Sequence, residues 1–164
     1  MAKHNVANRR AYQPLAYLYG FSLLLLTLTG FGQMPIFKRY YIADIPGLGW
    51  LAQFYVTHYL HYLAAIVLLA MAGYVIARYL AHDKNGISLT VSGRVRAGLL
   101  GLLIVTGLFL VWRNLAGVIL PPGFIILLDI SHLLLVMLLL GVTGFCRVTK
   151  RSWTVARAAA VKES

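Results

Sequence analysis

The residues of this chain that could do chemistry are a few ionisable side chains set inside long apolar runs. They are His58, His61, Arg113, Asp129 and His132. A charged side chain at the centre of a bilayer costs roughly 2.5–3.5 kcal/mol on insertion scales, so each of these residues needs a physical reason. Neutral imidazole is a common metal ligand. The pattern therefore indicates a site built around histidine.

His61 and His132 occupy matching positions in two different apolar runs. Each lies nine residues past the predicted outer end of its helix, at Ala52 or Gly123, which is roughly 13 Å at 1.5 Å per residue. Two histidines at one depth can ligate one haem iron from opposite faces, because haem b needs only axial ligands and an apolar slot. Two other interpretations are a polar contact between helices and exposure to water near the outer surface.

An outer polar layer is predicted one helical turn away from these two histidines. His58 precedes His61 by three residues and is either an alternative haem ligand or a contact for quinone. Asp129 stands in the same relation to His132 and could exchange protons with a quinone. Arg113 is permanently cationic and suits a haem propionate. The competing interpretation is an Arg113–Asp129 ion pair that holds two helices together.

Four apolar runs must position these residues. The chain has 164 residues, of which 60% are hydrophobic, and its mean hydropathy is +0.79. A spanning helix needs about 20 mostly apolar residues. We predict an all-α integral membrane protein, a four-helix transmembrane bundle forming a single domain over 1–164, with no internal repeat evident. The expected helices are 14–37, 52–80, 97–120 and 124–146, followed by a basic tail at 147–164.

The net charge of +11 is explained by membrane topology. The 15 Lys and Arg lie almost entirely between and outside the apolar runs, and no nucleic-acid motif accompanies them. The N-terminal tail, residues 78–96 and the C-terminal tail hold 3, 4 and 5 of these cations, whereas the opposite side holds Lys38, Arg39 and Arg113. The positive-inside rule therefore predicts a multi-pass protein of the cell (inner) membrane, with both termini cytoplasmic.

The chain lacks the sequence features of a complete enzyme. It has no soluble catalytic domain, nucleotide loop or catalytic triad. Cys146 is the only cysteine, so an iron–sulfur cluster would have to belong to a partner subunit. We therefore expect a subunit of a larger complex that contacts membrane lipid and transfers electrons.

Two segments carry a resemblance to a known family. The segment His61-Tyr62-Leu63-Ala64-Ala65, which leads to Arg78, and the segment Ser131-His132-Leu133 are similar to the ligand segments of the second and fourth helices in cytochrome b subunits of membrane-bound formate dehydrogenases and nickel–iron hydrogenases. The resemblance implies a quinone-linked redox role, haem b, and an iron–sulfur or cytochrome partner subunit on the outer side.

The sequence departs from that family at the inner haem, which is typically held by the first and fourth helices. The first run has no histidine, and Cys146 stands fourteen residues after His132. We therefore predict one haem b near the outer face, with quinone bound near His58, Arg113 and Asp129. The alternatives are a haem-free membrane anchor or scaffold subunit, and a small transporter with the outer polar layer as its substrate site.

Overall fold

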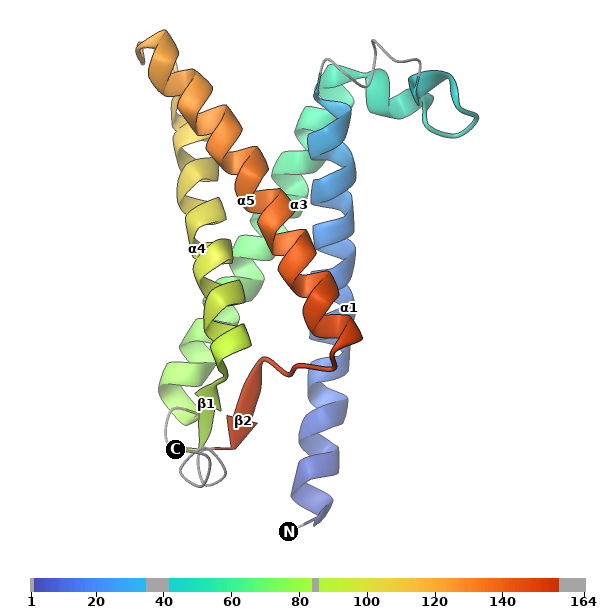
Figure 1. Cartoon of the computed structure of the whole chain (residues 1–164), viewed down its shortest axis with the longest axis vertical. Helices are drawn as coiled ribbons and strands as arrows, with labels where there is room; N and C mark the ends of the chain where they lie inside the picture. The colour runs from blue at the N-terminus through green and yellow to red at the C-terminus, as the bar shows by residue number, and fades with distance from the viewer. Residues whose placement is uncertain (1, 35–41, 84–85, 157–164) are drawn as a thin grey trace. The chain divides into compact units, whose positions relative to one another are not determined.

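The computed structural model describes residues 2–34, 42–83 and 86–156, which are mostly helical. The chain forms two compact units, Met1–Arg78 and Tyr79–Ser164, and each unit is built around a pair of long helices (Figure 1). Among the described residues the non-helical regular structure is one small sheet of two strands. The predicted predominance of helix is therefore confirmed, with a short sheet added.

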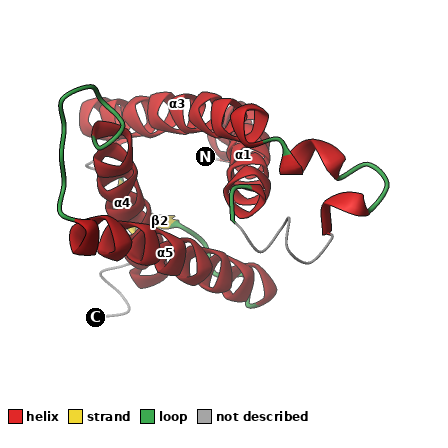
Figure 2. Cartoon of the chain, turned by 90° about the horizontal axis from the view of Figure 1, so that it is seen from above, coloured by secondary structure: helices red, strands yellow, loops and turns green. Residues whose placement is uncertain are grey.

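In the first unit, α1 (Ala2–Gly32) packs along α3 (Phe54–Arg78) (Figure 2). The short 3-10 helices η1 (Ile42–Asp44) and η2 (Gly49–Ala52) lie in the connection between them. The buried side chains of the long helices are mostly small or polar and recur every seven residues, which is the spacing of a packed helix pair. They are Ser22 and Thr29 on α1, with Thr57, Ala64 and Met71 on α3.

In the second unit, α4 (Val91–Trp112) packs along α5 (Pro122–Val148) (Figure 2). The π-helical turn η3 (Tyr79–Asp83) precedes β1 (Ile87–Leu89), which pairs antiparallel with β2 (Thr154–Ala156). The sheet therefore ties the segment before α4 to the segment after α5. It lies beside the start of α4 and draws the chain that follows α5 back to that end of the helix (Figure 1).

Local chemistry explains where α4 and α5 begin. The hydroxyl of Thr90 accepts a hydrogen bond from the backbone N–H of Gly93 at 2.9 Å and caps α4. Pro122 occupies the first position of α5, where a missing N–H costs nothing. Between the helices, Gly117 adopts a φ of +81°, a left-handed conformation that glycine reaches without strain.

Within the described part of the chain, four segments are long and apolar enough to cross a membrane: Gln13–Gly32, Phe54–Ala81, Val91–Trp112 and Pro122–Val148. Large apolar side chains are widely exposed on them, for example Tyr17, Ile66, Leu102 and Leu127. A soluble domain rarely exposes so much contiguous apolar surface. The helices are therefore consistent with a multi-pass membrane protein, as the sequence predicted.

The helix boundaries differ from the predicted ones. The third helix was expected at 97–120 but spans 91–112, because the Thr90 cap starts it early and the turn around Gly117 ends it early. The first helix starts at Ala2, so Pro14 lies inside it rather than in its first turn, and the predicted end at 37 lies outside the described residues. The predicted range 52–80 becomes Phe54–Arg78, which η3 continues to Asp83. The predicted range 124–146 lengthens by two residues at each end to Pro122–Val148.

Candidate functional site

His61 of the first unit is held by a threonine of the facing helix. Its Nδ1 atom lies 2.9 Å from the hydroxyl oxygen of Thr29, a side chain with no exposed surface. That hydroxyl donates its single hydrogen to the backbone carbonyl of Leu25 at 2.7 Å. When its hydrogen points to that carbonyl, the hydroxyl accepts from Nδ1–H of His61, and this arrangement is the tautomer with the ring's lone pair on Nε2.

His132 of the second unit has the same kind of partner. Its Nδ1 atom lies 2.8 Å from the hydroxyl oxygen of Thr106 on α4. The Thr106 hydroxyl donates to the carbonyls of Leu102 and Leu103, at 3.0 and 3.1 Å. The same arrangement, with the hydroxyl donating to these carbonyls, corresponds to the tautomer of His132 with its proton on Nδ1 and its lone pair on Nε2.

A glycine follows each of these threonines and lies against the imidazole. A methyl group added to Gly30 would lie 3.5 Å from Cε1 of His61, and one added to Gly107 would lie 3.6 Å from Cε1 of His132. Each unit therefore presents a Thr-Gly step on its first long helix and a histidine on its second. No repeat was evident in the sequence, although the Thr-Gly dipeptide that the two units share can be read there as Thr29-Gly30 and Thr106-Gly107.

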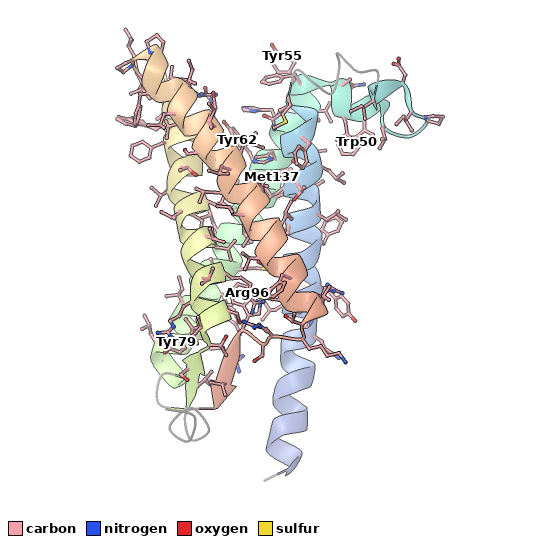
Figure 3. All side chains as sticks on the ribbon, in the orientation of Figure 1. Trp50, Tyr55, Tyr62, Tyr79, Arg96 and Met137 are labelled. Carbon is pink, nitrogen blue, oxygen red and sulfur yellow. The ribbon has the colours of Figure 1, made fainter. Side chains whose placement is uncertain are left out.

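One turn nearer the start of α3, His58 connects this helix to the residue that follows α1. Its Nδ1 atom lies 3.1 Å from Oε1 of Gln33, whose Nε2 donates to the carbonyl of Thr29 at 3.2 Å. The ring stacks on Phe54 with centroids 5.3 Å apart and contacts Tyr62 at 4.3 Å. Tyr62 itself lies along α3 (Figure 3). His58 is thus fixed on both faces by aromatic rings.

In the second unit, Asp129 lies one turn before His132 and forms with Arg113 the ion pair that the sequence offered as one interpretation. Nη1 of Arg113 donates to both carboxylate oxygens at 2.9 Å. Arg113 is the C-cap of α4 rather than a residue within it. Half of the Asp129 side chain remains exposed, so the pair leaves one carboxylate face accessible.

The five predicted site residues therefore fall into two internal groups. His58 and His61 of α3 contact α1, whereas Arg113, Asp129 and His132 lie at the α4–α5 contact. In the described ranges 2–34, 42–83 and 86–156, no cluster of three or more His, Cys, Asp or Glu side chains could hold a bare metal ion. The predicted anchors Lys38 and Arg39 lie outside those ranges.

Sequence reasoning missed a buried cation at the other end of the second unit. Arg96 is 4% exposed and donates to the carbonyls of Ser92 and Ser152, both at 3.1 Å. Its guanidinium also lies 4.2 Å from the ring centroid of Trp153. We call this contact, together with the β1–β2 sheet, the tail clasp. Its partners follow α5, where the sequence predicted only a basic tail.

Comparisons with known proteins add no assignment to this geometry. No protein-family model matches the chain, and no curated protein or solved structure is significantly similar to it.

Proposed function

We propose that the protein is a haem b-containing membrane subunit of a respiratory or redox complex, transferring electrons between a partner subunit on the outer side and the quinone pool. The observation that supports this most is the pair of histidine–threonine contacts. Each contact suits the tautomer with the ring proton on Nδ1 and the lone pair on Nε2. That tautomer is the one an axial imidazole ligand needs, with its other nitrogen hydrogen-bonded.

The residues present fit a haem b group. In the proposal His61 and His132 would hold the haem iron, and Arg113 would bind a propionate. The surrounding helix surfaces are rich in exposed leucine, isoleucine and valine, which suits an apolar macrocycle. Haem supplies reversible one-electron chemistry when bound, and the protein's part is to hold it and tune it. Positive charge outside the apolar runs supports cytoplasmic termini.

A haem-free anchor subunit is the second candidate, and one observation favours it. The Nδ1 atoms of His61 and His132 and the Arg113 guanidinium all have protein partners within their own units. These polar groups are therefore satisfied without a cofactor, as helix-bridging contacts in a membrane require.

A reduced-minus-oxidised visible spectrum of the purified protein separates these two functions. We expect a b-type band and, by pyridine haemochrome assay, about one haem per chain, because the proposed site uses one pair of axial ligands. A well-folded preparation without haem would favour the anchor. Two haems per chain would contradict the single site and require a ligand other than these histidines.

Replacement of Asp129 by Asn tests the proposed proton exchange with quinone. Asn preserves shape and hydrogen-bond acceptance toward Arg113 but cannot carry a proton. We expect quinone reduction to slow by at least tenfold, in line with the usual worth of a general acid or base, with haem content unchanged. Asp44→Asn, on exposed η1, is the control. Normal quinone turnover in Asp129→Asn would remove this residue from the proton path.

A further inference from the structure

We propose that Thr29 and Thr106 are positioning residues, each of which fixes the tautomer and raises the ligand strength of the histidine facing it. The effect on haem rests on the proposed function above, whereas the effect on the tautomer does not. Neither threonine stood out in the sequence, because a hydroxyl inside an apolar helix ordinarily bonds its own backbone. Both hydroxyls donate to a carbonyl of their own helix here. This bond leaves the hydroxyl oxygen to accept from the facing histidine.

The hydroxyl of each threonine is one link in a directed chain of hydrogen bonds. In the first unit the chain runs from Nδ1–H of His61 to the Thr29 hydroxyl and on to the carbonyl of Leu25. In the second unit it runs from His132 through Thr106 to the carbonyls of Leu102 and Leu103. Successive bonds of one direction polarise one another, so a hydroxyl that donates to a carbonyl accepts more strongly.

Burial keeps these bonds intact. Thr29 has no exposed surface, and Thr106 and both histidines are partly buried. The helix backbone holds each hydroxyl in place, since its donor bond reaches a carbonyl four residues back. Gly30 and Gly107 allow the imidazole to lie against the same helix. A rotated ring would leave its Nδ1–H unpaired among apolar side chains, which is costly.

The consequence for a bound metal centre has a definite sign. An imidazole whose Nδ1–H is hydrogen-bonded is a more basic ligand through Nε2. A more basic axial ligand stabilises the oxidised iron relative to the reduced iron, so it lowers the midpoint potential.

The variants Thr29→Val and Thr106→Val test this, because valine keeps the shape and removes the hydroxyl. Thr→Ser at either position keeps the hydroxyl and should restore wild-type behaviour. Thr27→Val is the matched control, since the Thr27 hydroxyl donates to the carbonyl of Leu23 at 2.7 Å in the same helix without facing a histidine. All variants would be made in the full chain.

Two readouts separate this inference from the proposed function. In the haem-depleted full chain, ¹⁵N NMR of the imidazole rings should show the Nδ1–H tautomer for His61 and His132, and a shift toward mixed tautomers in the valine variants alone. In the haem-loaded protein, the valine variants should bind haem about 10- to 100-fold more weakly, the usual cost of losing such a partner, and have a raised midpoint potential.

Each outcome has one meaning. Unchanged tautomers in the valine variants would overturn the positioning role. Altered tautomers with an unchanged potential and haem affinity would overturn its effect on the metal centre. If the wild-type protein binds no haem, the proposed function fails while the NMR measurement still decides whether the threonines fix the rings.

Discussion

Substitution of either His61 or His132 by alanine is expected to remove the b-type haem, whereas the same substitution at His58 should leave haem content unchanged. Each of the first two imidazoles supplies one of two axial bonds in the proposed site, and haem b has no covalent attachment to compensate. His58 differs because its ring is stacked on Phe54 and hydrogen-bonded to Gln33. Its role is therefore to connect α3 to the residue that follows α1.

The measurement is haem per chain by pyridine haemochrome, with helical content checked by circular dichroism. Alanine is the best helix former, so none of the three changes should unfold its helix. Haem loss in His58→Ala with retention in His61→Ala would transfer the ligand assignment to His58. Full haem content in both His61→Ala and His132→Ala would end the bis-histidine proposal.

Replacement of Gly93 by alanine is expected to open the tail clasp. A methyl group at this position would overlap the backbone carbonyl oxygen of Trp153 and lie 3.0 Å from its carbonyl carbon. Backbone atoms cannot rotate away as a side chain can, so the segment after α5 must shift. That shift pulls Trp153 and Ser152 away from Arg96. Overpacking of this kind typically costs about 1–3 kcal/mol.

Amide hydrogen exchange in β1 and β2 measures the opening directly, because local opening sets the exchange rate of paired amides. We expect exchange to accelerate about tenfold or more, since each 1.4 kcal/mol is a factor of ten. Gly98→Ala is the control, as a methyl group there meets nothing within 4 Å in the same helix. Equal exchange rates in the two variants would show that the clasp does not depend on this close approach.

The sequence predicted the existence of the long helices well, because a helix that spans a bilayer needs a long apolar run. Such runs can be recognised without any knowledge of packing. The Arg113–Asp129 ion pair could also be suggested from the sequence, since opposite charges in apolar surroundings usually pair with each other. Boundaries were harder. Thr90 caps α4 within a polar stretch. Because Arg94 and Arg96 are charged, the first turn of α4 was predicted to be part of a loop.

The histidine–threonine contacts were beyond sequence reasoning for a different reason. The hydroxyl of a threonine in an apolar helix can hydrogen-bond a backbone carbonyl of its own helix. The presence of threonine in the sequence therefore gives no sign of a partner on another helix. The partner is chosen by which helices pair, and this chain pairs α1 with α3 and α4 with α5. The seven-residue spacing of Ser22 and Thr29 on one face is a signal that could have been read.

The tail clasp also sets an order of events during synthesis. Arg96 precedes its carbonyl partners at Arg151 and Ser152 by 55 and 56 residues. At translation rates of about 5–20 residues per second, these partners are synthesised roughly 3–11 s after Arg96. All of α5 is made within that interval. The second unit therefore reaches its final form only after its last helix has left the ribosome, so ribosomes stalled before Ser152 should carry chains in which Arg96 is still hydrated.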